Sequence, residues 1–170
     1  MNIPTLTTER LRLREFRESD FPAYVEMIGD PAVARFLADG KPLDRVNAWR
    51  QMAMFAGHWA LRGYGVWAVE ERATGDFIGR IGCFYPEGWP EFEIGYTLRR
   101  SAWGKGYASE GAAAALNYAR TVLQKRDIIS VIRPDNVGSQ NVARKLGATL
   151  AETVDFYGAP ALIYRYPATG

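Results

Sequence analysis

Three short apolar segments separated by two tight turns constrain the fold of this chain more than any other feature. The segments have the length and the β-branched and aromatic content of strands. They are VWAVEE (66–71), FIGRIGCFY (77–85) and EFEIGYTL (91–98). The turns between them, ATGD (73–76) and EGWP (87–90), contain the residues that favour chain reversal. Because strands joined by such short turns pair side by side in opposite directions, the sequence predicts an antiparallel meander.

Helices and further strands flank the meander. Leu11 and Leu13 alternate with arginines, which predicts a half-exposed strand with a solvated arginine face. Further elements follow from capping residues, apolar periodicity and turn signals. They are a short helix capped by Ser19 or Asp20, a longer one from Asp44 to about Leu61, an alanine-rich helix over 112–121, an apolar strand over 127–132, a short helix before Gly147, and a hairpin around Tyr157-Gly158. This order predicts a mixed sheet in one α/β domain, residues 1–170.

Composition narrows the possible partners and the compartment. The 21 Lys and Arg against 19 Asp and Glu leave a net charge of +2, too small to indicate a nucleic-acid partner. The one cysteine, Cys83, excludes an internal disulfide and is typical of a reducing compartment. The first residues contain no apolar signal segment, and no apolar run is long enough to span a bilayer. We therefore expect a cytoplasmic protein without a membrane partner.

The stretch WGKGYASEG (103–111) carries the strongest local chemical signal. Its glycines at 104 and 106 precede a helix, whose N-terminal N–H groups and dipole favour an anion. No P-loop run is present. A dinucleotide fingerprint fails at Ser109, and an RNA-binding strand fails where Ser109-Glu110 replaces its apolar residues. The remaining interpretation is a loop that wraps a pyrophosphate without a metal.

A second pattern lies downstream, where Asn136 and Ser139 form N-x-x-S and Lys145 opens KLG. With this pattern, the chain resembles GNAT-superfamily N-acetyltransferases of the RimJ/RimL type. TERLRLREF (8–16), EIGYTL, WGKGYASEG and N-x-x-S with KLG match that group in order. The resemblance implies a central, mostly antiparallel sheet of about seven strands flanked by helices, and acetyl-CoA as co-substrate.

The resemblance also implies the residues that bind the cofactor. Two strands, over 91–98 and 127–132, should part so that the pantetheine arm pairs with the backbone of 97–99. The implied cofactor-binding residues are Thr97, Leu98, Arg99, Trp103, Gly104, Lys105, Gly106, Tyr107, Ala108, Asn136, Ser139 and Lys145. This sequence departs from the group at Ser101, where relatives have Arg or Gln, and at Ala143, where many have a tyrosine general acid.

Two acidic residues are candidates for the general base. Strand alternation would place Glu91 and Glu93 on one face. Glu93 is deeper in the strand and matches the position of the base in some relatives, so we favour it, acting through water. The alternative is a solvated strand glutamate. The resemblance suggests Ser139 as the acid.

These residues indicate an enzyme that transfers the acetyl group of acetyl-CoA to a primary amine. The alternative is a non-catalytic acyl-CoA-binding sensor or scaffold with the same fold. The acceptor stays open among a protein N-terminus, an amino acid, a polyamine and an antibiotic, and no metal is expected. A homodimer is compatible with the sequence. Aromatic turn residues are candidates to line the acceptor cleft. They are Tyr64, Tyr85, Trp89 and Tyr157.

Overall fold

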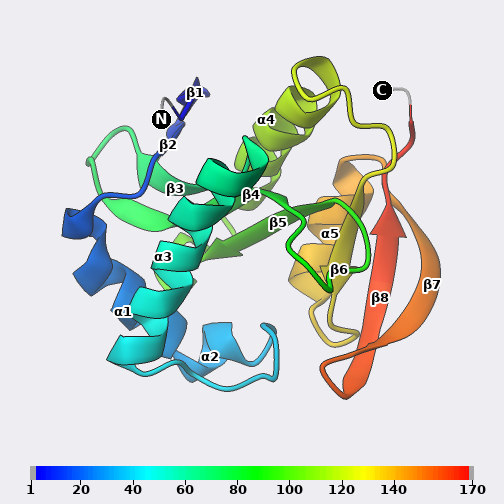
Figure 1. The fold of residues 1–170 in the computed structure, drawn as a ribbon, viewed down its shortest axis with the longest axis horizontal. Helices are drawn as coiled ribbons and strands as arrows, with labels where there is room; N and C mark the ends of the chain where they lie inside the picture. The colour runs from blue at the N-terminus through cyan, green and yellow to red at the C-terminus, as the bar shows by residue number, and fades with distance from the viewer. Residues whose placement is uncertain (1–2, 169–170) are drawn as a thin grey trace.

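The computed structural model describes residues 3–168 and contains one eight-stranded sheet in the order β1-β2-β3-β4-β5-β6-β8-β7 (Figure 1). The strands are β1 Leu6–Thr7, β2 Leu11–Arg14, β3 Val66–Glu71, β4 Phe77–Phe84, β5 Glu93–Leu98, β6 Ile129–Ile132, β7 Thr149–Phe156 and β8 Ala159–Arg165. All neighbouring strands are antiparallel except β5 and β6, which are parallel. The predicted mixed, mostly antiparallel sheet is confirmed. The strand beyond the expected seven is the two-residue β1.

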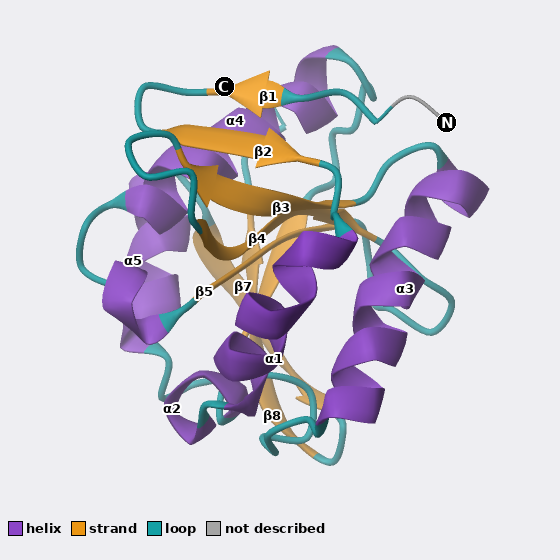
Figure 2. Ribbon diagram, turned by 90° about the vertical axis from the view of Figure 1, so that its left-hand side faces the viewer, coloured by secondary structure: helices purple, strands orange, loops and turns teal. Residues whose placement is uncertain are grey.

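Helices cover both faces of the sheet (Figure 2). They are α1 Phe21–Gly29, α2 Pro31–Ala34, α3 Arg45–Arg62, α4 Tyr107–Thr121 and α5 Val137–Lys145. In β3, Val66 and Ala68 pack in the cluster formed with α1 and α3, whereas Trp67 and Val69 pack in the cluster formed with α4. This alternation explains why β3 is apolar at nearly every position: both faces are covered. No helix within residues 3–168 combines the length and apolarity needed to cross a membrane.

Local signals explain the ends of the helices. Asp44 caps α3, as predicted, by accepting a hydrogen bond from the Asn47 N–H at 2.7 Å, and Gly63 at φ 74° ends the helix close to the predicted end at Leu61. The alanine-rich helix, expected from 112, begins at Tyr107. Gly106, at φ 80°, is its N-cap, so the second half of the glycine motif is the first turn of α4.

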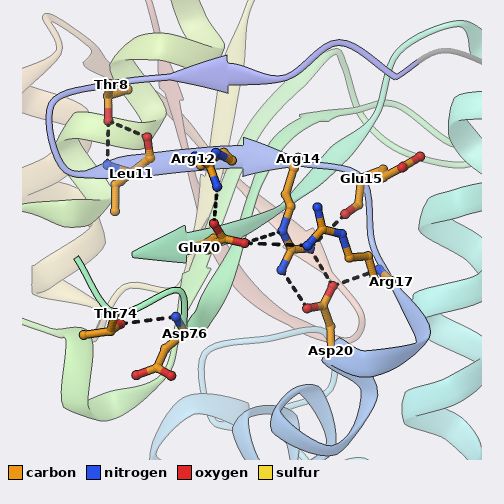
Figure 3. Close-up of polar contacts among 10 residues, drawn as sticks. All are labelled: Thr8, Leu11, Arg12, Arg14, Glu15, Arg17, Asp20, Glu70, Thr74 and Asp76. Carbon is orange, nitrogen blue, oxygen red and sulfur yellow. Dashed lines mark hydrogen bonds and ion pairs between the residues drawn. The ribbon is translucent and has the colours of Figure 1, made fainter. Parts of the chain in front are cut away.

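The arginine face of β2 is exposed at Arg12, as the sequence predicted, but buried at Arg14 (Figure 3). Arg14 is buried and forms two bonds to Asp20, both of 2.8 Å, and one to Glu70 of 2.8 Å. Arg12 also pairs with Glu70, at 2.6 Å. The helical turn before α1 and the neighbouring β3 supply these carboxylates, so tertiary pairing overrides the exposure expected from the local pattern. We call Arg12, Arg14, Asp20 and Glu70 the ion cluster.

Candidate active site

The sheet opens between β5 and β6. Their only paired register is Glu93 opposite Ile129, and the Ile129 N–H donates to the Phe92 carbonyl at 3.0 Å. Beyond it, side chains bridge the strands: Ser130 Oγ donates to the Ile94 carbonyl at 2.6 Å, and the Val131 N–H donates to Glu93 Oε1 at 3.1 Å. The parting of these strands, expected from the resemblance, is therefore present.

Glu93 lies at the point where the strands part and is only 7% exposed. Its Oε1 accepts the backbone N–H of Val131, and its Oε2 accepts the indole N–H of Trp89 at 2.6 Å. Burial raises the pKa of Glu93 to about 7, an effect that these two donors and the charge of Arg80 only partly oppose. Near neutral pH this carboxyl group therefore populates both protonation states, as a general base requires.

Glu91 has a different environment. It precedes β5 and forms a bidentate ion pair with Arg165, at 2.9 and 2.6 Å. Hydrogen bonding to Arg165 lowers the pKa of Glu91, against a smaller opposing effect of burial. The strand begins only at Glu93, and the carboxylate of Glu91 before it is paired with Arg165 of β8, so of the two acids only Glu93 has no paired cation among the described residues. The common face of the two side chains stays a prediction.

A cavity of about 850 Å³ adjoins Glu93 on the α3 side of the sheet. Its walls come from α3, β4, β5 and the turns at 86–89 and 155–157. Its lining includes Arg50, Gln51, Phe55, Arg80, Glu87, Trp89, Glu93, Thr97, Asp155 and Tyr157. We call it the acceptor cavity. Of the four aromatic turn residues expected at a cleft, Trp89 and Tyr157 line it, whereas Tyr64 and Tyr85 are not among its lining residues.

A second cavity, of about 490 Å³, lies against the N-terminal ends of α4 and α5. We call it the cofactor cavity. Its lining includes these residues predicted to bind the cofactor: Thr97, Leu98, Trp103, Gly104, Gly106, Tyr107, Ala108, Asn136 and Ser139. Arg99, Lys105 and Lys145 are not part of it.

The N-terminus of α4 fits a pyrophosphate. Gly104 and Gly106 have φ of 74° and 80°, which favours glycine, and a Cβ added at Gly104 would meet only open space. No side chain caps the helix, so its first N–H groups point outward without an intrahelical partner. A positive dipole end with accessible N–H groups suits the diphosphate of a coenzyme A ester.

The ion pair between Arg10 and Glu110 stabilises this loop. Arg10 donates to Glu110 Oε2 at 2.7 Å and to the carbonyl of Lys105 at 2.8 Å, and its guanidinium lies 4.6 Å from the ring centre of Tyr107. Arg10 also neutralises the Glu110 carboxylate, which in the first turn of α4 would otherwise repel a bound anion. No sequence signal indicated this pair, because its members are 100 residues apart.

The residues of β5 whose backbone N–H and C=O groups point towards the opening differ in part from those predicted. The Arg99 N–H donates to the Ile78 carbonyl at 2.9 Å, so it is committed to β4. Alternation along an antiparallel strand gives Thr97 the same direction and turns Tyr96 and Leu98 towards the opening. The expectation for the backbone of Thr97 and Arg99 is therefore wrong, although the side chain of Thr97 remains available. The backbone of Tyr96, a residue that the sequence did not indicate, faces the opening instead.

At the start of α5, Asn136 and Ser139 lie at the boundary of the two cavities. Asn136 Oδ1 accepts the Ser139 N–H at 3.1 Å and so caps the helix, while the Tyr96 hydroxyl donates to the Ser139 carbonyl at 2.8 Å. Within residues 3–168, Ser139 Oγ makes no hydrogen bond to protein. Ala143 is fully buried, and Lys145 is exposed at the far end of α5, so the structure does not bring Lys145 to the site.

The two cavities share six lining residues and thus meet at the sheet opening. These are Phe36, Leu37, Tyr96, Thr97, Asn136 and Ser139. A ligand in one cavity can therefore reach a ligand in the other beside Glu93. Elsewhere in residues 3–168, no group of three or more His, Cys, Asp or Glu side chains is placed to hold a metal ion.

Comparison with known proteins agrees with this geometry. Residues 10–149 match the family described as acetyltransferase (GNAT) domain. The Bacillus subtilis protein YkkB is 32% identical over 173 residues, which cover 96% of each chain. A solved acetyltransferase from Agrobacterium tumefaciens is 34% identical, with a TM-score of 0.87 over 98% of this chain and 95% of that one.

The structure of RimL, a ribosomal L7/L12 α-N-protein acetyltransferase in complex with coenzyme A, has a TM-score of 0.79 at 21% identity. It covers 96% of this chain and 98% of that one. At that identity the likeness shows the fold alone, so the RimJ/RimL subtype stays a prediction. The family match and the two closer relatives decide the class: this chain belongs to the GNAT family and is an acetyl-CoA-dependent acyltransferase.

Proposed function

We propose that the chain transfers the acetyl group of acetyl-CoA to a primary amine, of a small molecule or a protein N-terminus, by direct attack of the amine on the thioester. One observation carries this proposal: a buried carboxyl group with a pKa of about 7 lies where a cavity for the acceptor meets a cavity for the cofactor. A sensor that only binds acyl-CoA has no need for a base at that junction.

Glu93 removes a proton from the amine, directly or through water. An α-amine is mostly protonated at neutral pH and a lysine amine almost wholly so, because their pKa values are near 8 and 10.4. Only the neutral amine has a lone pair for attack. The carboxylate of Glu93, held by the N–H groups of Val131 and Trp89, lies inside the acceptor cavity and fulfils this task.

The glycine loop and the edge of β5 bind the cofactor. Acetyl-CoA, when bound, supplies an acetyl thioester and a thiolate leaving group. The N–H groups at Gly104, Gly106 and the first turn of α4 hold its diphosphate, and the backbone of Tyr96 and Leu98 holds its pantetheine arm. Asn136 and Ser139 line the junction from α5, and the Ser139 hydroxyl would pass a proton to the departing thiolate while regaining one from water.

Release of free thiol from acetyl-CoA tests the proposal. The purified chain is incubated with acetyl-CoA and, in turn, a panel of amino acids, polyamines, aminoglycosides and N-terminal peptides. We expect thiol release that depends on an amine, together with a product in which mass spectrometry shows one hydrogen replaced by an acetyl group. Calorimetric binding of coenzyme A without thiol release for any amine would instead favour the sensor.

A further inference from the structure

Arg80 is the one charged side chain on β4 that faces the acceptor cavity. It lies opposite Thr97 of β5, on the same sheet face as Glu93, which pairs with Phe84. The rows of Arg80 and Glu93 are therefore four residue steps apart along β4, which corresponds to about 13 Å along the strand. Because both side chains are long and point into the same cavity, one small molecule can reach both.

Among the described residues, no carboxylate lies within ion-pair distance of the Arg80 guanidinium. Within residues 3–168 its Nε is also buried without a hydrogen-bond partner. It lies 4.8 Å from the ring centre of Phe55 on α3. A half-buried cation without an anionic partner is unfavourable, so such a group is suited to an anion supplied by a ligand.

The neighbours of Arg80 do not supply that anion. The Tyr24 hydroxyl lies close by, but burial raises its pKa to about 12, with Arg80 opposing, so it stays neutral and donates to Gln51. Glu93 is only partly ionised at neutral pH.

The remaining charges of the acceptor cavity leave this end positive. Arg50, on α3, contributes a second cation beside Gln51. Arg50, Glu87 and Asp155 are all exposed, so water screens these three charges and the half-buried Arg80 is the cation with the strongest effect inside the cavity. The cavity thus combines a cationic end at Arg80 with a proton-accepting group at Glu93.

We infer that the acceptor is an amine that also carries a carboxylate, and that Arg80 binds this carboxylate while the amine lies beside Glu93. This inference rests on the proposed acetyl transfer and names its substrate class. Polyamines and other purely cationic amines are excluded by it, because they would place a positive charge against Arg80. An arginine can bind a carboxylate through two parallel N–H bonds, which also fixes the orientation of the amine.

Matched acceptors test the inference directly. The wild type is assayed at pH 9, where Glu93 is ionised, with ω-amino acids of increasing chain length and with the corresponding ω-amino carboxamides. Each pair differs in the carboxylate and has a similar amine. We expect kcat/KM to be at least tenfold higher for the best amino acid than for its carboxamide. Equal values within each pair, or faster acetylation of the carboxamides and polyamines, would overturn the inference while leaving acetyl transfer intact.

Variants then locate the subsite. In Arg80→Gln the preference for the carboxylate should fall at least tenfold, mainly through KM, and Arg80→Lys should retain part of it. Equal losses on both members of a pair would mean that Arg80 only adjusts the cavity or Glu93, and would overturn the assignment. Loss of the preference in Arg50→Gln but not in Arg80→Gln would overturn it as well.

A binding measurement on the wild type does not depend on turnover or on the folding of a variant. Calorimetry in the presence of coenzyme A compares the same amino acids with their carboxamides. Tighter binding of the amino acids supports the carboxylate subsite even if no thiol is released, an outcome that would count against the proposed function alone. Equal or weaker binding of the amino acids contradicts the subsite.

Discussion

Arg14 and Arg80 lie in one row across the sheet, since Arg14 pairs with Ala68 and Ala68 pairs with Arg80. Both face the α1 and α3 side, about 10 Å apart. Arg14 is enclosed by Asp20 and Glu70, whereas Arg80 has no carboxylate partner within residues 3–168. The same residue type thus serves the fold in the ion cluster and remains available to a ligand in the acceptor cavity.

Glu70 in the ion cluster and Glu93 in the acceptor cavity differ in the same way: in the described part of the chain, only Glu70 is paired with a cation. Burial alone would raise the pKa of Glu70, but hydrogen bonds and charges from Arg14 and Arg12 outweigh it, and the pKa is lowered. Glu93 receives two N–H donors without a paired cation, and burial raises its pKa to about 7. Charges that the protein pairs internally become structural, and those that it leaves unpaired are suited to chemistry and binding.

The largest expected effect is on catalysis, when Glu93, the acid without a paired cation, is replaced. Glu93→Gln should lower kcat/KM by about 100- to 10,000-fold at pH 8, the usual contribution of a general base. The difference should shrink below pH 7, where wild-type Glu93 is protonated, and again at high pH, where the amine loses its proton unaided. A pH–rate profile of both proteins on one active amine measures this.

Glu91→Gln is the matched control, because Glu91 lies two residues away but pairs with Arg165 outside both cavities. Its profile should follow that of the wild type. If Glu93→Gln also follows the wild type across the range, Glu93 is not the base.

Of the two arginines, Arg14 should contribute more to the free energy of unfolding, because it is paired with carboxylates. Arg14→Met leaves Asp20 buried without its cation and Glu70 paired only with the more exposed Arg12, so the free energy of unfolding should fall by about 3–5 kcal/mol. Arg80→Met removes no ion pair and should cost less than about 1 kcal/mol. Urea unfolding of the two variants measures both values. Similar losses at the two positions would mean that Arg80 has a structural partner after all.

The smallest effect concerns the cofactor loop. Gly104→Val should weaken coenzyme A binding tenfold or more, about 1.4 kcal/mol, because its side chain enters the space in front of the α4 N-terminus. Gly75→Val provides the control for backbone strain: Gly75 also has a positive φ, 78°, with open space around it, and lies in the β3–β4 turn. Calorimetry should find the wild-type affinity in Gly75→Val, and equal weakening in both variants would refute the loop assignment.

The elements that the sequence predicted well depend on local signals. Strand β3, the Asp44 cap, the end of α3 at Gly63 and the hairpin at Tyr157-Gly158 all follow from residues within one turn or strand. The glycine motif likewise predicts that a helix follows it, although the helix begins five residues earlier than expected. Local conformational preference is sufficient at these positions.

The remaining features depend on contacts between distant segments. Arg14 and Arg80 have similar strand patterns around them, and only the tertiary positions of Asp20 and Glu70 distinguish their environments. Glu93 owes its raised pKa to burial at the gap between β5 and β6, which no local pattern indicates, and one of the donors that partly oppose this shift, Val131, is 38 residues away. The motif alone led to the prediction that Lys145 binds the cofactor, but Lys145 is the last residue of α5 and lies at the end of the helix away from the site.

Direct titration of the Glu93 carboxyl tests the account most sharply. The ¹³C chemical shifts of labelled glutamate carboxyl groups are followed from pH 4 to pH 9, and the resonance of Glu93 is identified by its absence from the Glu93→Gln spectrum. We expect a midpoint of about 7 for Glu93, while every ion-paired glutamate is already ionised at pH 6. A Glu93 midpoint at or below the ordinary value of 4.5 would contradict the unpaired, buried base on which the proposed chemistry depends.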